Sequence, residues 1–264
     1  MSIAQPHALS VVLPVLDERQ NVERLIERFD KLKDELGLEE LIFVDDGSRD
    51  GTLEFLEQSS HLNHGYGIRT ISREQKLGQV DACITGSRVA KGHFVAVMDA
   101  DLQHPPEAIP SMLRGLQGGC DIAVGSRYVN GARVRRNPER GVISRGAMIV
   151  AHFLLPVSNR MLDPLSGFFV ARKDLITDLK RLRGRCKLLL FVLSVHKDVR
   201  VTEVGFDFEE RSNGRSKTVD VSLSFIVRYL IELITYMKVR SSVDSRFVSA
   251  PSRAIAPTES PVAG

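Results

Sequence analysis

The chain has 264 residues, of which 43% are hydrophobic and 26% charged, with a formal net charge of +3. This composition is typical of a folded protein with a substantial core, and so small a positive charge gives no reason to expect a nucleic-acid partner. The three cysteines are far apart and form no C-x-x-C pair, which argues against a disulfide framework or a zinc site. We recognise no secretory signal and no apolar run of about 18 residues that would span a membrane.

Apolar runs of strand length alternate with helical patterns through the first half of the chain. Five buried strands alternating with helices predict an α/β fold built on an open, mostly parallel, doubly wound sheet. A dinucleotide site or a P-loop is not predicted, because neither glycine motif occurs. The expected strands are 9–13, 41–44, 67–72, the run that begins at 94, and 121–124, and the expected helices are 18–36, 76–90, 105–117 and one after the loop 45–52.

Acidic side chains follow several of these strands. Asp17 and Glu18 come after the first strand, Asp45 and Asp46 after the second, and a further acidic pair after the fourth. In an open α/β sheet, ligands bind at the carboxyl ends of the strands. We therefore expect these acidic groups to gather at one edge of the sheet and to form part of a binding site.

The acidic pair after the fourth strand is Asp99 and Asp101, followed by Gln103 and by two prolines that stop the strand. An extended backbone would place both carboxylates on one side, where they repel unless a cation lies between them. Hard oxygen ligands favour Mg2+ or Mn2+, with substrate phosphates in the remaining positions. A metal-bridged diphosphate is the first hypothesis, and the alternative is a solvated turn that caps the next helix.

The second half of the chain is more basic at its start. Residues 127–145 contain six arginines and one acid, which predicts an anion site or a surface that faces lipid headgroups. The segments 142–157 and 219–237 have helical apolar stripes that suit docking on a membrane surface, or else ordinary core packing. A turn at 163–168 is predicted to enter a strand, 187–196 to form a buried helix and 199–204 another strand.

The predicted domain organisation is simple. Residues 1–8 form an N-terminal extension, 9–240 a single domain, and 241–264 a disordered tail that is rich in Ser, Pro and Ala without periodicity.

An ordered set of motifs makes the interpretation specific. In this order and over residues 9–238, the motifs resemble inverting GT-A glycosyltransferases of family 2, and within that family the dolichol-phosphate (polyprenyl-phosphate) mannosyltransferases that lack transmembrane helices. The motifs are Pro14-Val15-Leu16-Asp17-Glu18, Val44-Asp45-Asp46-Gly47-Ser48-Arg49-Asp50-Gly51-Thr52, Asp99-Ala100-Asp101-Leu102-Gln103-His104-Pro105-Pro106, Gly125-Ser126-Arg127-Tyr128 and Asp163-Pro164-Leu165-Ser166-Gly167-Phe168.

The resemblance implies a GT-A fold, with residues 9–125 binding a nucleotide sugar and residues 126–240 binding the acceptor. It implies a hexosyltransferase that moves mannose from GDP-mannose to the phosphate of dolichol or another polyprenyl phosphate, with Mg2+ or Mn2+ as cofactor. Such an enzyme would dock peripherally on the cytoplasmic face of a membrane, with a separate membrane-anchoring subunit as a further possibility. The alternatives are UDP-glucose or UDP-GlcNAc as donor, a sugar hydroxyl as acceptor, or a non-catalytic nucleotide-sugar-binding protein.

The same resemblance assigns roles to individual residues. One departure is Asp17, which stands where the family usually has asparagine. Catalysis is expected to depend on Asp101, Arg127, Arg140, Ser144 and Lys217. The remaining assignments are Asp99, Asp101 and Gln103 to the metal, Pro14, Leu16, Glu18 and Asp46 to the nucleoside pocket, Arg127, Arg140 and Ser144 to the acceptor phosphate, and Arg211 and Lys217 to the donor phosphates.

Overall fold

The computed structural model describes residues 8–73, 78–129, 161–179, 187–196 and 198–207, and the single positions 231, 234, 235 and 238. The predictions for 142–157 and for the tail 241–264 lie outside the described residues, as do nearly all of those for 206–218 and 219–237.

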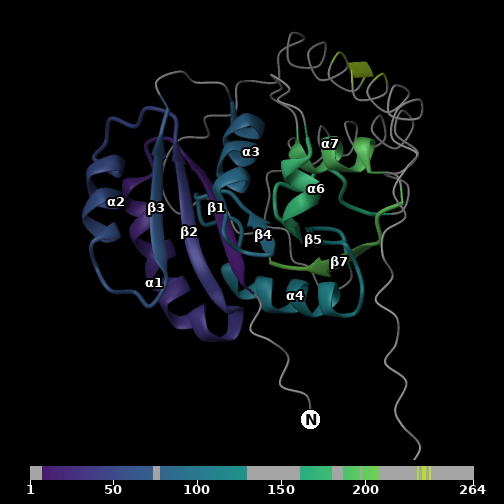
Figure 1. Cartoon of the computed structure of the whole chain (residues 1–264), viewed down its shortest axis with the longest axis horizontal. Coiled ribbons are helices and arrows are strands. Elements are labelled where there is room, and N and C mark those ends of the chain that lie inside the picture. Colours follow the sequence, from purple (N-terminus) through teal and green to yellow (C-terminus); the bar gives the residue numbers. More distant parts are fainter. Residues whose placement is uncertain are drawn as a thin grey trace, which may run out of the picture.

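The described strands form one seven-stranded sheet in the order β3-β2-β1-β4-β6-β5-β7 (Figure 1). Strand β6 is antiparallel to both of its neighbours, whereas the other pairs are parallel. The expectation of an open, mostly parallel sheet is thereby confirmed. The strands are β1 (Leu9–Val15), β2 (Leu38–Asp45), β3 (Gly67–Ser72), β4 (Phe94–Val97), β5 (Ile122–Ser126), β6 (Phe169–Arg172) and β7 (Val201–Gly205).

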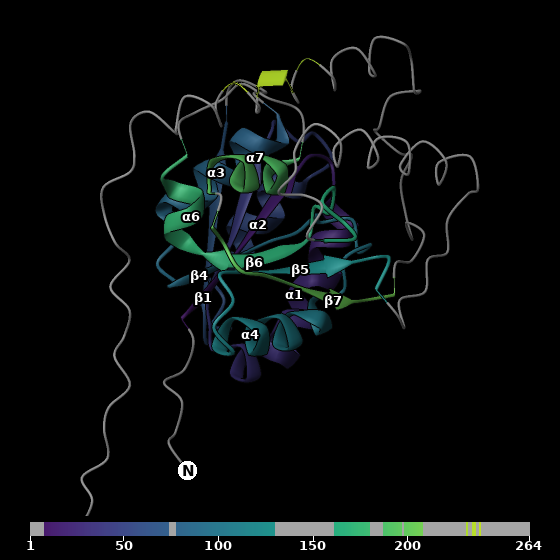
Figure 2. The same cartoon turned by 90° about the vertical axis from the view of Figure 1, so that its right-hand side faces the viewer.

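Helices cover both faces of this sheet (Figures 1 and 2). Alternate residues of β1 enter opposite cores: Val12 packs with the α3, α6 and α7 side, and Leu13 with the α1, α2 and α4 side. None of the helices in the described part of the chain has both the length and the apolar character needed to cross a bilayer. The helices are α1 (Arg19–Leu36), α2 (Thr52–Ser60), α3 (Gln79–Val89), the 3-10 turn η1 (Pro106–Ala108), α4 (Ile109–Gln117), α6 (Lys173–Thr177) and α7 (Leu188–Val195).

Strand β1 continues past the proline that was expected to end it. Pro14 lies opposite Val44 of β2, but the pairing of β1 with β4 ends at Val12. Proline is tolerated in a strand where its missing N–H interrupts no ladder, and beyond Val12 the ladder to β4 has already ended. The strand therefore carries the chain two residues further, toward the loop that contains Asp17 and Glu18.

Strand β6 lies between β4 and β5, which the sequence pattern did not indicate. Its insertion brings the turn before it beside the end of β5, where the Gly125 N–H donates to the Phe168 carbonyl at 2.9 Å. A Cβ atom on Gly125 would lie 2.6 Å from Phe168 Cδ1 and 2.8 Å from Met112 Cε, so only glycine allows this close packing. The turn and the carboxyl ends of β4 and β5 consequently meet.

Candidate functional site

The loops that follow β1 and β2 are joined by hydrogen bonds. The Asp17 N–H donates to Ser48 Oγ at 2.8 Å, the Arg49 N–H donates to Asp17 Oδ1 at 2.8 Å, and the Glu18 N–H donates to Thr52 Oγ1 at 3.0 Å. Asp17 has a positive φ of 50°, a conformation that aspartate and asparagine adopt more readily than most residues. Because either side chain supplies the oxygen that receives the Arg49 N–H, aspartate retains the local structure of this loop.

The two acids at the end of β2 have different surroundings. Asp45 is buried and accepts hydrogen bonds from the Gly47 N–H at 2.9 Å and from Ser48, so it holds the turn. The neighbouring Asp46 forms an ion pair with Arg73, which follows β3. Asp45 therefore has a structural role, whereas Asp46 lies at the carboxyl edge of the sheet.

Arg73 joins three elements at this edge. Its Nε lies 2.6 Å from Asp46 Oδ1, its Nη1 lies 2.8 Å from Asp81 Oδ2, and its Nη2 donates to the Gly78 carbonyl at 3.1 Å. All three charged side chains are nearly buried, with exposures of 8%, 11% and 4% for Arg73, Asp46 and Asp81. The sequence reasoning missed Arg73, although a basic residue directly after a strand that ends at the acidic edge is a usable signal.

Replacing Arg73 with glutamine is expected to lower the free energy of unfolding by about 3–5 kcal/mol, because two nearly buried carboxylates lose their cation. Urea denaturation measures this change. Arg19→Gln is the control for a surface pair, since Arg19 lies 3.0 Å from Glu23 and the two side chains are 32% and 52% exposed. Equal losses in the two variants would show that the Arg73 pairs contribute no more than a surface contact.

The Asp99 and Asp101 pair lies in a turn, so the prediction of an extended backbone through both acids is wrong. Strand β4 ends at Val97, and Leu102 has a positive φ of 65°. The Asp99 side chain is 29% exposed and accepts a hydrogen bond from the Gln79 amide, whereas Asp101 is buried and accepts the Gln103 N–H at 3.1 Å. Because of this turn, the Asp101 carboxylate is buried while the Asp99 carboxylate remains partly exposed to solvent.

His104 holds this turn in place. The Asp99 N–H donates to His104 Nδ1 at 3.0 Å, and the imidazole stacks on Phe168 with ring centroids 5.2 Å apart. Burial lowers the pKa of His104, the charges of Lys187 and Arg127 act in the same direction, and Asp99 and Asp101 oppose them. The ring is therefore neutral at pH 7, as its acceptor role requires.

The oxygen donors at the turn suit an open cation site. Within the described ranges, no cluster of three or more His, Cys, Asp and Glu side chains is arranged to hold a metal ion. Two carboxylates and the amide of Gln103 are instead the available hard ligands, a set that Mg2+ or Mn2+ accepts when substrate phosphates occupy further positions. The residues present thus fit a cation shared with a ligand.

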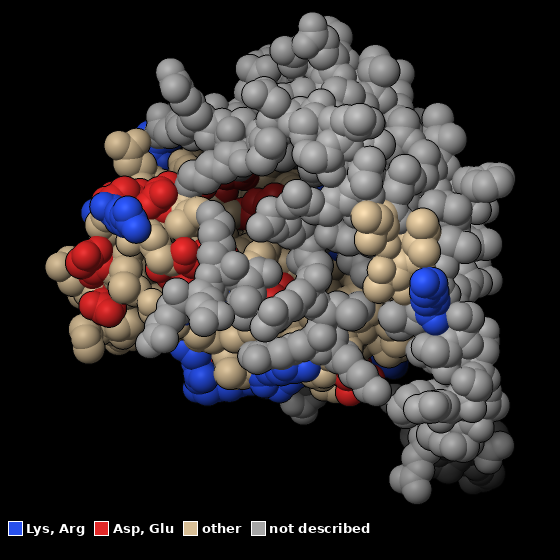
Figure 3. Space-filling model, turned by 90° about the horizontal axis from the view of Figure 1, so that it is seen from above, with Lys and Arg blue, Asp and Glu red and all other residues tan. Residues whose placement is uncertain are grey.

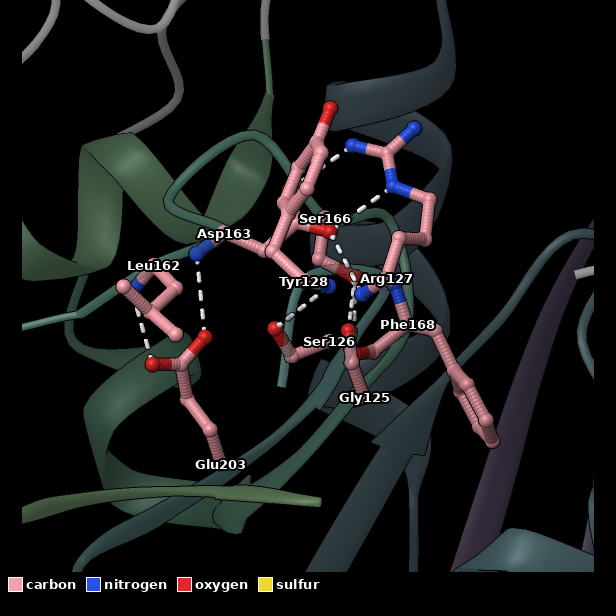
Figure 4. Close-up of polar contacts among 9 residues, drawn as sticks. All are labelled: Gly125, Ser126, Arg127, Tyr128, Leu162, Asp163, Ser166, Phe168 and Glu203. Carbon is pink, nitrogen blue, oxygen red and sulfur yellow. Dashed lines mark hydrogen bonds and ion pairs between the residues drawn. The ribbon is translucent and has the colours of Figure 1, made fainter. Parts of the chain in front are cut away.

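Arg127 follows β5 and binds Asp163 through its planar fork (Figure 4). The Nε–Oδ2 and Nη2–Oδ1 distances are both 2.7 Å, and the Arg127 N–H donates to Oδ2 at 3.1 Å. Burial opposes the charged form, but the hydrogen bonds and charge of Asp163 outweigh it and raise the pKa of Arg127. The guanidinium is therefore permanently cationic and fixed in orientation.

Asp163 is in turn positioned by Glu203 of β7. The Glu203 carboxylate accepts the Leu162 N–H at 2.7 Å and the Asp163 N–H at 2.9 Å (Figure 4). Ser166 Oγ closes the same turn by donating to the Gly125 carbonyl at 2.7 Å. The end of β5, the turn before β6 and strand β7 thus form one polar network around Arg127.

The described residues with predicted roles all lie at the carboxyl ends of parallel strands. Seen from above, this end of the molecule shows red acidic side chains among the described atoms (Figure 3). Arg140, Ser144, Arg211 and Lys217 lie outside the described residues. The predicted residues that the structure does place are Pro14, Leu16, Glu18 and Asp46 on β1, β2 and their loops, Asp99, Asp101 and Gln103 after β4, and Arg127 after β5.

Solved structures identify the fold. Two crystal structures of glucosyl-3-phosphoglycerate synthase from Mycobacterium tuberculosis, one with Mn2+, UDP and glucosyl-3-phosphoglycerate and one with Mg2+ and UDP, both match with a TM-score of 0.64. The sequence identities are 23% and 24%, and each match covers 89% of this chain and 80% of the solved chain. The protein therefore has the GT-A glycosyltransferase fold, as expected.

Sequence comparison identifies the family. Glycosyl transferase family 2 matches residues 10–175, and the chain belongs to this family. Dolichol-phosphate mannosyltransferase of Pyrococcus furiosus is 38% identical over 86% of this chain, which spans 64% of that relative's length. The dolichol-phosphate mannosyltransferase of Saccharomyces cerevisiae is 36% identical over 85% of both chains, and polyprenol monophosphomannose synthase of Mycolicibacterium smegmatis is 32% identical over 78% and 79%. The resemblance drawn from the motifs is confirmed.

Proposed function

We propose that the protein transfers mannose from GDP-mannose to the phosphate of dolichol or another polyprenyl phosphate, with inversion at the anomeric carbon. The observation that carries the proposal is the placement of a carboxylate pair after β4 and of Arg127, fixed by Asp163, after β5, both at one edge of the sheet. The names of the relatives support mannose as the transferred sugar and dolichol phosphate or a polyprenol phosphate as the lipid.

The donor would lie over the ends of β1, β2 and β4. Pro14, Leu16 and Glu18 would line the nucleoside pocket, and Asp46, held by Arg73, would accept a hydrogen bond from the base or ribose. Asp99, Asp101 and Gln103 would hold Mg2+ or Mn2+. When bound, this cation supplies positive charge that neutralises the leaving diphosphate.

The acceptor would approach Arg127 from the other half of the molecule. A phosphate oxygen forms the new bond to the anomeric carbon, while the bond from that carbon to the diphosphate breaks and its electron pair leaves with GDP. Because a phosphate is already ionised at neutral pH, no general base is required, whereas a hydroxyl acceptor would need one. Arg127 would hold the anionic nucleophile in line, and the sequence assigns Arg140 and Ser144 to the same phosphate and Arg211 and Lys217 to the donor.

Each half of the domain would bind one substrate: residues 9–125 bind the donor and residues 126–240 bind the acceptor. A polyprenyl chain stays in the bilayer, so the enzyme must work at a membrane surface. We infer peripheral docking on the cytoplasmic face through the basic run 127–145 and the apolar segments 142–157 and 219–237, with or without a separate anchoring subunit.

The test uses purified protein, Mg2+ or Mn2+, and a short polyprenyl phosphate embedded in anionic liposomes. GDP-mannose, UDP-glucose and UDP-GlcNAc are supplied separately, and product lipids are identified by mass. We expect mannosyl phosphate lipid from GDP-mannose alone, loss of product with EDTA, and sedimentation of the protein with the liposomes at low salt. Product from a uridine donor, or transfer only to a hydroxyl acceptor, would contradict the proposal.

A further inference from the structure

We propose that Lys187, to which the sequence reasoning gave no role, is a substrate-binding residue whose ammonium donates to a phosphate oxygen at the reaction centre. The inference rests on the proposed function and adds a cation that faces the Asp99 carboxylate. The shared chemistry is a phosphate oxygen, which either the donor diphosphate or the acceptor phosphate could supply.

Lys187 stands directly before α7 with an extended backbone, at φ −78° and ψ 123°. The helix behind it is apolar and buried from Leu188 to Leu193, so this cation lies at the end of a hydrophobic element rather than on a solvated face. Lys187 is only partly exposed, and lysine seldom leaves solvent without an anionic partner. The position of its ammonium group therefore needs an explanation.

The ammonium lies against Gly167, in the turn before β6. A Cβ atom on Gly167 would be 3.6 Å from Lys187 Nζ, 3.6 Å from Asp99 Oδ2 and 3.5 Å from His104 Cε1. Groups from the acidic turn after β4 and from the start of α7 thus converge on one glycine. Because glycine has no side chain, a small cavity remains beside the ammonium, with room for about one ligand atom such as a phosphate oxygen.

Lys187 and Asp99 face this space without forming an ion pair, among the contacts that the described residues make. The other cations described near the acidic turn are already paired, Arg73 with Asp46 and Asp81, and Arg127 with Asp163. Lys187 is therefore a further cation at this edge, one that no carboxylate among the described residues holds in an ion pair.

The lining of a small cavity also places Lys187 beside the acidic turn. Gln79, which binds Asp99, lines the same small cavity as Lys187 and Gly167. A lysine ammonium has three donors on a flexible stem and suits a phosphate oxygen that approaches a carboxylate-bound cation.

The test compares Lys187→Met, which keeps the aliphatic stem, with Lys187→Arg, which keeps the charge. Losing a hydrogen bond to a charged group lowers kcat/KM roughly 10- to 100-fold in Lys187→Met. Lys187→Arg is expected to recover part of this loss. Lys91→Met is the matched control, because Lys91 is exposed and precedes β4 at the opposite edge of the sheet.

Separate measurements identify which phosphate is bound. If Lys187 contacts the donor, the affinity for GDP with Mg2+, measured by calorimetry, falls in Lys187→Met. If it contacts the acceptor, GDP affinity is unchanged and the KM for polyprenyl phosphate rises. Unchanged GDP affinity together with unchanged kinetics for both substrates would overturn the inference.

Failure of the proposed function gives a different result. The wild-type protein would then make no mannosyl phosphate lipid, while calorimetry on wild type and Lys187→Met still tests the residue: weaker binding of GDP or of a short polyprenyl phosphate supports the inference, and equal binding of both overturns it. Should Lys187→Met unfold, Lys187→Arg and Lys187→Gln are compared in the same assays.

Discussion

Asp101→Asn is expected to reduce kcat/KM for mannosyl transfer roughly 10²- to 10³-fold, the range seen when one group that stabilises developing charge is removed. The substitution preserves shape, and the asparagine oxygen still accepts the Gln103 N–H that Asp101 accepts at 3.1 Å. It removes one of the two carboxylate charges that would hold the cation. Initial rates measured over a range of Mn2+ concentrations should therefore show a lower maximum rate. The Mn2+ concentration that gives half of this maximum should be higher than for the wild type.

Asp174→Asn is the matched control for this experiment. Asp174 is 59% exposed, pairs with Arg172, and follows antiparallel β6, so it lies at the opposite edge of the sheet. Its substitution should leave both the rate and the metal dependence unchanged. An Asp101→Asn enzyme with the wild-type rate at the wild-type Mn2+ requirement would exclude the proposed cation site.

Asp163→Asn is expected to lower the free energy of unfolding by about 3–5 kcal/mol, because it leaves the Arg127 guanidinium without a counter-charge. The Asp163 side chain is fully buried and that of Arg127 only 12% exposed, so water cannot replace the lost partner. Transfer should also fall about 10²-fold through misplacement of Arg127. Urea denaturation measures the first effect and steady-state kinetics the second.

Kinetics separate a positioning role of Asp163 from a purely structural one. If the carboxylate orients Arg127 toward the acceptor, the KM for polyprenyl phosphate rises while the affinity for GDP is retained. Asp121→Asn offers a comparison, since Asp121 pairs with the 40% exposed Arg172 and the 70% exposed Arg200, and should cost no more than about 1 kcal/mol. A stable, fully active Asp163→Asn protein would contradict both expectations.

The first half of the fold was predictable because each element is encoded locally. Strands of four to eight residues alternate with helical patterns, and Gly37 ends α1 with a left-handed φ of 55°. The placement of β6 was not predictable, since the apolar run Phe169–Arg172 does not indicate its neighbours or its direction. The short helix α6 was missed because five residues cannot display a helical period.

The residues of the candidate site were likewise predictable only in part. Asp46, Asp99 and Asp101 could be placed at one edge, because strand ends are visible in the sequence and parallel strands end together. The partners that set their chemistry could not be found, because Arg73, Asp163 and Lys187 reach the site only through tertiary packing. Arg127 shows the consequence: its motif marked it as an anion ligand, but the buried carboxylate that fixes it lies 36 positions away.

The antiparallel strand between β4 and β5 also has a consequence for how the protein folds. These two strands are successive along the chain but do not pair with each other, so β5 and the edge of β4 that faces away from β1 must wait for a segment synthesised later. Such non-local pairing is slow because chain entropy is lost before contacts compensate for it. A nascent chain that stops before Phe169 would present two open strand edges, which favour aggregation. When β6 inserts, it covers these edges and so prevents aggregation. The same step places the turn that contains Asp163 beside Arg127, so the active arrangement should form at the same time.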